Sequence, residues 1–177
     1  DYVKSLGMST ISGHYGMDIV EKSWPQTCDE AKLLGQEYVT VPWLNENYYK
    51  TLDDLKKTCD TINKAAEVAK SKGLKTAYHN HAFEFKQVDG QVIFDVMLAE
   101  LDPKLVSMEM DIFWVVNAGQ DPLQIFEKYP KRFQQWHVKD MDKSDRNRNA
   151  DVGTGSIDYK KIFAAAKKSG MKHFYIE

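Results

Sequence analysis

Six short runs of apolar and β-branched residues recur along the chain, and each has the length and composition of a buried strand. They cover residues 8–12, 37–42, 74–79, 105–111, 134–139 and 172–177. Helical patterns lie between them, at about 25–35, 51–72, 93–101, 122–129 and 158–169. The strands start roughly 29–38 residues apart, the length of one βα unit, which predicts a parallel sheet that curls around itself through right-handed crossovers.

This alternation favours an α/β protein of the (β/α)8 TIM-barrel class over an open, doubly wound sheet. An open nucleotide-binding sheet needs a Gly-rich phosphate loop after its first strand, whereas Gly153-Thr154-Gly155 falls in a later loop. About six βα units are visible. We therefore expect residues 1–177 to be a single barrel domain that is incomplete at both ends, with the terminal strands outside this sequence.

The composition indicates a globular protein whose partner is a small molecule. The 24 lysines and arginines nearly balance 26 acidic residues, so a net charge of −2 gives no broad attraction to nucleic acid or to an anionic membrane. No apolar run approaches the roughly 20 residues that span a bilayer. We expect a cytoplasmic protein, or a periplasmic one if a signal peptide precedes this sequence, and leave a homo-oligomer open. Cys28 and Cys59 fall within predicted helices and are expected to be buried free thiols.

Polar residues gather where the predicted strands end. In a parallel barrel the functional site forms at the C-terminal ends of the strands. The residues found there are His79 and His81, Glu109 and Asp111, His137 and Lys139, and Glu177. Because side chains alternate along a strand, Glu109 and Asp111 share one face, and His137 and Lys139 share another.

Carboxylates and imidazoles that converge in a low-dielectric interior are costly unless a cation or mutual hydrogen bonds compensate them. Nitrogen and carboxylate oxygen without thiolate suit Mn²⁺, Co²⁺, Zn²⁺, Fe²⁺ or Mg²⁺, and the sequence does not choose among these. The alternative is an interior of mutually satisfied ion pairs that holds no metal.

Five segments together resemble the xylose isomerase-like superfamily of sugar phosphate isomerases/epimerases, whose relatives include inosose dehydratase, tagatose 3-epimerase and endonuclease IV. They are YHNHAFEF at 78–85, MEMDIFWVVNAGQDP at 108–122, WHVKDM at 136–141, VGTGSIDYKKIF at 152–163 and FYIE at 174–177. The resemblance extends over essentially the whole chain. It implies a TIM barrel and one divalent metal ion held by a Glu, an Asp, a His and a second Glu.

Asp111, His137 and Glu177 match the last three of these metal ligands. The chain departs from the family at the first place, where His79 stands instead of the usual Glu. The resemblance therefore leaves the fourth ligand open between His79, His81 and a water molecule.

The candidates for catalytic roles are Glu177, Lys139 and Glu109. Lys139 can bind an oxyanion or transfer a proton, and the alternative is a surface lysine paired with Asp140 or Asp142. Glu109 can act as a base or orient a metal ligand.

The candidates for substrate contacts are His14, His81, Trp114 and Lys139. His14 comes just after the first predicted strand, where it can reach a substrate. Trp114 offers a flat apolar face on which a sugar ring can rest, although aromatic residues more often serve packing.

The resemblance implies proton abstraction next to a carbonyl, through an enediolate of a keto-sugar or related polyol. Our leading hypothesis is a divalent-metal-dependent sugar isomerase/epimerase. A lyase or dehydratase acting on a keto-sugar or 3-keto-glycoside uses the same metal site and is the first alternative. A noncatalytic sugar-binding barrel is the second. An endonuclease IV-like DNA repair enzyme is less favoured, because the net charge is −2 and Trp114 stands where that relative has a histidine ligand.

Overall fold

The structure is a computed structural model that describes residues 2–177. These residues form two compact units. Unit 1 contains the residues up to 78 together with 88–106, and unit 2 contains 79–87 and 107–177. No helix in the described part of the chain is long and apolar enough to cross a membrane.

Unit 1 contains three parallel strands. They are β1 (Ser12–His14), β2 (Tyr38–Val41) and β3 (Lys75–His79), which pair in that order; the last residue of β3, His79, belongs to unit 2. β2 is buried along its whole length, as expected of a strand covered on both faces. The strand predicted at 8–12 is wrong, because pairing with β2 begins only where Ser12 meets Tyr38. His14 is consequently the last residue of β1 rather than a residue after it.

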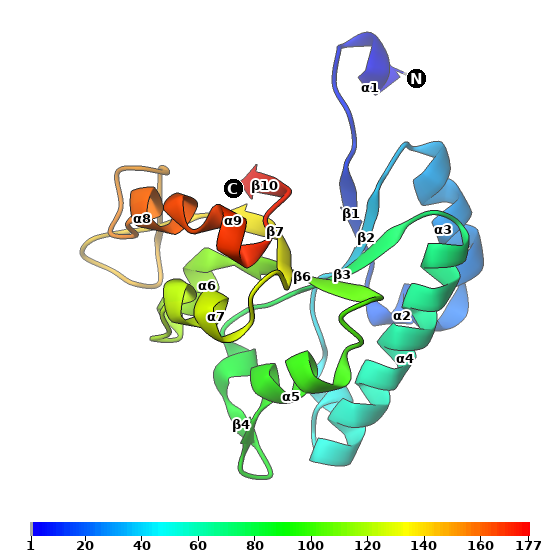
Figure 1. The fold of residues 1–177 in the computed structure, drawn as a ribbon, viewed down its shortest axis with the longest axis horizontal. Helices are drawn as coiled ribbons and strands as arrows, with labels where there is room; N and C mark the ends of the chain where they lie inside the picture. The colour runs from blue at the N-terminus through cyan, green and yellow to red at the C-terminus, as the bar shows by residue number, and fades with distance from the viewer. Residues whose placement is uncertain (1) are drawn as a thin grey trace. The chain divides into compact units, whose positions relative to one another are not determined.

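The helices of unit 1 follow the apolar periodicity of the sequence. They are α1 (Tyr2–Ser5), α2 (Met17–Lys22), α3 (Trp24–Leu33), α4 (Leu52–Ser71) and α5 (Ile93–Glu100), with a 3-10 helix η1 (Glu46–Tyr48). Figure 1 shows α3 and α4 side by side, and the Trp24 Nε1–H donates to the Ala65 carbonyl at 2.8 Å. A capping box between Thr51 and Asp54 starts α4. The predicted helices at 25–35, 51–72 and 93–101 are confirmed, whereas α1 and α2 were not predicted.

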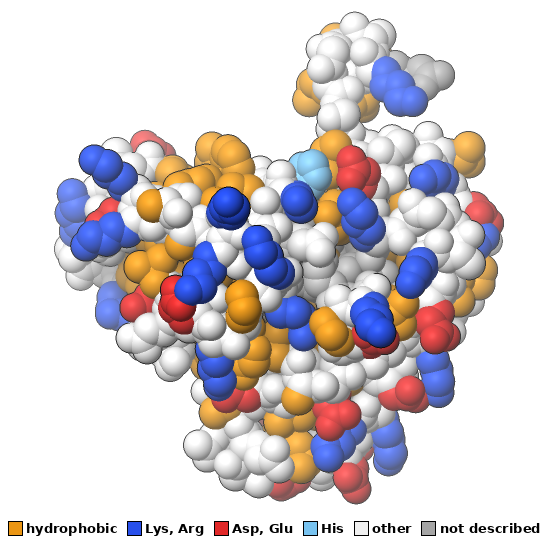
Figure 2. Space-filling view, viewed as in Figure 1, with side chains coloured by type: hydrophobic (Ala, Val, Ile, Leu, Met, Phe, Trp, Pro, Cys, Tyr) orange, Lys and Arg blue, Asp and Glu red, His pale blue; other side chains and the backbone are white. Residues whose placement is uncertain are grey.

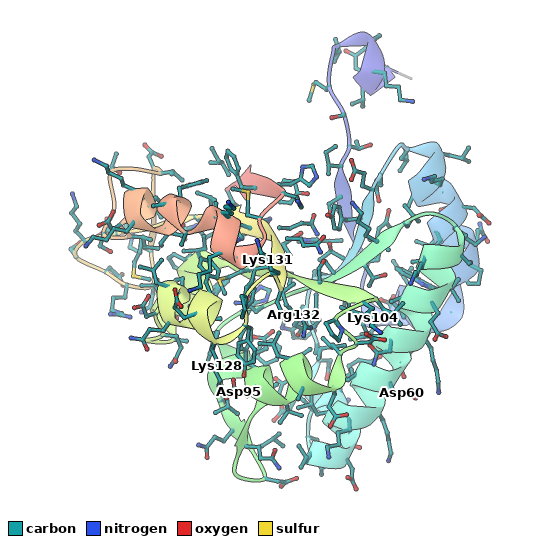
Figure 3. All side chains as sticks on the ribbon, in the orientation of Figure 1. Asp60, Asp95, Lys104, Lys128, Lys131 and Arg132 are labelled. Atoms are coloured by element: carbon teal, nitrogen blue, oxygen red, sulfur yellow. The ribbon has the colours of Figure 1, made fainter. Side chains whose placement is uncertain are left out.

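The outer side of α4 is charged. Asp60, labelled in Figure 3, pairs with Lys64 at 2.7 Å, and both side chains are exposed. An exposed pair of this kind contributes little to stability, because water screens both charges. Acidic and basic side chains are also interspersed on the face drawn in Figure 2, in keeping with the nearly balanced composition.

Unit 2 is built on a second parallel set of strands. They are β6 (Val106–Asp111), β7 (Phe133–Val138) and β10 (His173–Ile176), which pair in that order. His137 in the middle strand, β7, pairs with Asp111 of β6 on one side and with Tyr175 of β10 on the other. This register brings the C-terminal ends of the three strands together, as the sequence predicted.

The connections of unit 2 are shorter and more irregular. They are η2 (Phe83–Phe85), α6 (Ile112–Asn117), α7 (Pro122–Lys128), α8 (Tyr159–Ala164) and α9 (Ala166–Ser169), with the antiparallel pair β8 (Asp140–Met141) and β9 (Asn149–Ala150). The single helix predicted at 158–169 is wrong in detail, because it breaks at Ala165. α6 was not predicted, since it starts directly from the end of β6. Asp89 and Gly90 form the turn between β4 (Gln87–Val88) and β5 (Gln91–Val92), with φ of 47° and 79°.

An aromatic cluster fills the apolar side of β7. Trp136 stacks on Phe126 with ring centroids 5.2 Å apart and contacts Phe163 edge-on at 5.4 Å. Lys131 and Arg132, labelled in Figure 3, precede β7. Because Trp136 is buried in this cluster, the alternation along the strand directs His137 to the opposite face.

Candidate metal centre

Asp111, His137 and Glu177 lie together at the C-terminal ends of β6, β7 and β10. One ligand atom from each residue lies within 4.8 Å of the others. His137 Nδ1 is 3.6 Å from Asp111 Oδ2 and 3.2 Å from Glu177 Oε2. The structure thus brings together the three residues that the sequence proposed as metal ligands.

One oxygen of the Asp111 carboxylate accepts a hydrogen bond, and the other points toward His137 in this group. Oδ1 caps α6 by accepting from the Trp114 backbone N–H at 3.1 Å. Oδ2 is buried and has no hydrogen-bond partner among residues 2–177. A buried carboxylate oxygen without a partner is costly. A cation at this place would remove that cost, so the residues present fit a divalent ion.

His79, the last residue of β3, lies against the same carboxylate. Its Nδ1 is 3.1 Å from Glu109 Oε1, and its Nε2 is 3.8 Å from Asp111 Oδ2. The ring of His79 is 4.8 Å from that of His137. The side chains of His79 and Glu109 are only 4% and 1% exposed, so both belong to the enclosed part of the site.

The pKa of His137 reports the local charge. Burial lowers this pKa, but the neighbouring carboxylates of Asp111, Glu109 and Glu177 outweigh burial and raise it above the usual value. Negative charge is therefore in excess around the ring. A site of this kind favours a cation.

Lys139 is buried and pairs with Glu177. Its Nζ lies 2.5 Å from Glu177 Oε1 and within 6 Å of the ring centres of Phe113 (5.7 Å) and Trp114 (5.9 Å). Its backbone carbonyl accepts from the Tyr159 hydroxyl at 2.7 Å. The alternative of a surface lysine paired with Asp140 or Asp142 is therefore wrong.

His81 lies beside His79 but faces an aromatic surface. Its ring is 5.6 Å from that of Trp114 and 6.5 Å from that of Phe83. The pKa of His81 is lowered to about 4, mainly by burial and then by the nearby His79 ring. His81 is consequently neutral at pH 7 and can exchange hydrogen bonds with a hydroxyl group.

Asp140 was not identified from the sequence, yet it organises the loop beside Lys139. Its fully buried carboxylate accepts from the backbone N–H groups of Met141, Gly153, Gly155 and Ile157, at 2.8, 2.9, 3.0 and 3.1 Å. A Cβ on Gly155 would collide with this carboxylate. An acidic residue after a strand, followed by a Gly-x-Gly loop, is the signal that could have revealed it.

His14 ends β1 in unit 1 and is exposed. Its role in substrate binding stays a prediction.

Comparison with known proteins agrees with this architecture. Residues 19–177 match the model of the family described as xylose isomerase-like TIM barrel. The chain belongs to this family. The predicted barrel fold and the resemblance stated from the sequence are therefore confirmed.

Relatives of known name also match. Inosose dehydratase from Clostridium perfringens is 33% identical over 100 residues, which are 56% of this chain and 31% of the relative. Inosose dehydratase from Clostridium beijerinckii is 29% identical over 106 residues, 60% of this chain and 35% of the relative. The matches thus span about a third of the length of these curated relatives.

Solved structures match over nearly the whole chain. A sugar phosphate isomerase/epimerase from Parabacteroides distasonis has a TM-score of 0.87 and 29% identity, over 99% of this chain and 65% of that one. The IolI protein with a bound zinc atom has a TM-score of 0.78 at 14% identity, over 100% of this chain and 71% of that one, and shares the fold.

Proposed function

We propose that this protein is a divalent-metal-dependent carbohydrate isomerase or epimerase that transfers a proton next to a carbonyl through an enediolate. Asp111, His137 and Glu177 would hold the ion. The observation that carries the proposal is the buried Asp111 Oδ2, which accepts no hydrogen bond from the described residues and faces His137 in a group with Glu177 whose ligand atoms lie within 4.8 Å. The match to the Parabacteroides distasonis protein, named as a sugar phosphate isomerase/epimerase, supports the reaction class.

A bound divalent ion would polarise the carbonyl and adjacent hydroxyl oxygens of the substrate and lower the free energy of the enediolate. The proton carrier must be a group that a substrate can reach. The side chains of Asp111 and Glu109 are each 1% exposed, whereas Glu177 lies beside Lys139, with 2.5 Å between Oε1 and Nζ. Glu177 is therefore the carboxylate that we assign to proton transfer, and Glu109 is too enclosed for that role.

Lys139 supports this reaction from beside Glu177. Its ammonium group lies 2.5 Å from Glu177 Oε1, which orients the carboxylate and places a positive charge where an oxyanion forms. When Glu177 returns the proton to the neighbouring carbon, the product is an isomer. Protonation of the original carbon from its opposite face, by water or another group on that side, gives an epimer.

Dehydration is the second candidate, because curated relatives with 29–33% identity are named inosose dehydratase. Glu177 would again remove the proton from carbon. Lys139 would then protonate the departing β-hydroxyl, which leaves as water, and regain its proton from Glu177. The two candidates share every step up to the enediolate and differ only in the fate of that intermediate.

The test combines metal analysis with product analysis. We expect the purified protein to retain one divalent ion per chain, and Glu177→Gln to lose both the ion and turnover of keto-sugars, inosose and 3-keto-glycosides. The matched control is Glu127→Gln, which removes an exposed glutamate that pairs with Lys168 elsewhere in unit 2. The control should keep both properties.

Reactions run in D₂O separate the outcomes. Isomers and epimers gain deuterium at carbon, and dehydration gives an unsaturated product with ultraviolet absorbance. Full turnover by Glu177→Gln would overturn the assigned role. Substrate binding without turnover or metal would instead identify a noncatalytic sugar-binding barrel.

A further inference from the structure

Glu109 lies behind both histidines of the candidate centre. Its Oε1 is 3.1 Å from His79 Nδ1 and 3.8 Å from His137 Nε2. Glu109 stands two residues before Asp111 on β6, on the same face of the strand, and its side chain is 1% exposed. One enclosed carboxylate therefore faces one nitrogen of each imidazole.

This arrangement determines which nitrogen of each ring faces the centre. An ionised carboxylate only accepts hydrogen bonds, so an ionised Glu109 requires the hydrogen of His79 to be on Nδ1, 3.1 Å from Oε1. The opposite atom, His79 Nε2, then lies 3.8 Å from Asp111 Oδ2. In His137 the order is reversed, because Nε2 faces Glu109 while Nδ1 lies 3.6 Å from Asp111 Oδ2.

The distances to Asp111 Oδ2 fit ligands of a shared ion better than hydrogen bonds. At 3.6 and 3.8 Å they exceed the length of a hydrogen bond. Tetrahedral ligands at about 2.0–2.1 Å from an ion lie roughly 3.3 Å apart. Small inward movements of the two rings would therefore bring both nitrogens to the spacing that an ion requires.

We propose that His79 Nε2 is the fourth metal ligand, and that Glu109 is a positioning residue that orients His79 and His137. This inference rests on the proposed function. It makes the centre a site of two imidazole nitrogens and two carboxylate oxygens. Such a donor set favours Zn²⁺, Co²⁺ or Fe²⁺ over Mg²⁺, which prefers oxygen ligands.

His81, the other candidate for the fourth place, lies in a different environment. Its ring stacks near Phe83 with an interplanar angle of 16° and lies beside Trp114. Its backbone N–H donates to Glu84 Oε2 at 2.8 Å. Among the described residues, His79 shares a group that could hold a metal with Glu109 and His137, and His81 belongs to no such group.

The experiment measures metal affinity without a substrate. Zn²⁺, Co²⁺ and Mg²⁺ are titrated calorimetrically into the metal-free protein and into its His79→Gln, Glu109→Gln and Glu109→Ala variants. His81→Gln is the matched control for metal affinity. We expect Glu109→Ala to bind Zn²⁺ about 10–100-fold more weakly, the range typical of partners that orient metal-binding histidines. Glu109→Gln should lose less, because its amide oxygen can still accept from His79 Nδ1–H.

His79→Gln tests the ligand itself. It should weaken Zn²⁺ binding more than Glu109→Ala does and reduce the preference for Zn²⁺ over Mg²⁺ by at least about tenfold, because one imidazole is lost. His81→Gln should leave both quantities unchanged. Nitrogen-15 spectra of the Zn²⁺-loaded protein should show His79 protonated at Nδ1 and His137 protonated at Nε2.

Each failure has a distinct meaning. A wild-type protein that binds none of the three ions overturns the proposed function and this inference with it. Tight binding by the wild type together with unchanged affinity in His79→Gln, or lost affinity in His81→Gln, overturns the fourth ligand alone. Unchanged affinity in Glu109→Ala, or the opposite tautomers in the spectra, overturns the positioning role. If Glu109→Ala does not fold, the volume-matched Glu109→Gln variant and the wild-type spectra still decide that role.

Discussion

Replacement of Asp140 by asparagine changes one atom of a carboxylate that accepts four backbone hydrogen bonds. Oδ1 accepts from Met141 and Ile157, and Oδ2 accepts from Gly153 and Gly155. Asparagine keeps the shape of the side chain but replaces one of these oxygens by an NH₂ group, which cannot accept. In either orientation of the amide, two backbone N–H groups lose their acceptor.

The expected loss is calculated from these contacts. Each hydrogen bond to a charged acceptor contributes about 1.5–3 kcal/mol, so the loss of two amounts to about 3–6 kcal/mol. The loop at 151–157 lies partly at the surface and can turn its freed N–H groups toward water, which recovers part of this loss. We therefore expect the lower end, about 3 kcal/mol, which corresponds to about a 100-fold change in a local opening equilibrium.

Amide hydrogen exchange measures this local opening directly. The amides of Gly153, Gly155 and Ile157 should exchange about 100-fold faster in Asp140→Asn than in the wild type. The matched control is Asp142→Asn, because Asp142 accepts from exposed Ser144 rather than from this loop. Equal protection of the three loop amides in wild type and Asp140→Asn would show that the carboxylate does not hold the loop.

Two further predictions concern unit 1. Burial raises the pKa of Cys28 to about 11 and that of Cys59 to about 12, so neither thiol should react with a disulfide reagent at pH 8 until denaturant unfolds the chain. Rapid reaction of the folded protein at pH 8 would contradict this. Thr51→Ala removes the capping box of α4 and should lower the free energy of unfolding by about 1 kcal/mol in urea titrations. An unchanged midpoint and slope would show that the cap contributes nothing.

Much of the fold could be predicted because its signal is local. Apolar periodicity predicted β2, β3, β6, β7 and β10 to within about two residues, the usual uncertainty of element boundaries. The errors concern the start of β1 and the break in the last helical segment, which no local sequence signal marks. β1 begins where pairing with Tyr38 begins, and the helix predicted at 158–169 breaks at Ala165, where no glycine or proline marks the sequence.

The site could be predicted in part because strand ends are visible in the sequence. The parallel register that places Asp111 opposite His137 is a consequence of the fold class, so the two residues were expected to meet. The partner of Lys139 could not be predicted, because proximity in sequence suggested Asp140 whereas the fold supplies Glu177. Asp140 was missed because its hydrogen bonds reach residues 13–17 positions later in the chain.

The sequence could not show which of His79 and His81 is the metal ligand, because residues two positions apart on a strand point to the same face. That rule holds only while the chain remains in the sheet, and β3 ends at His79. The next residue, Asn80, turns its amide to the Asp111 backbone, accepting from N–H at 3.3 Å and donating to C=O at 3.4 Å. These two contacts hold Asn80, the residue after β3, beside the end of β6, and beyond it the chain enters the turn toward η2. His79 is thereby held facing Glu109 and Asp111, while His81 faces the aromatic rings. The choice between two identical side chains thus depends on where one strand ends.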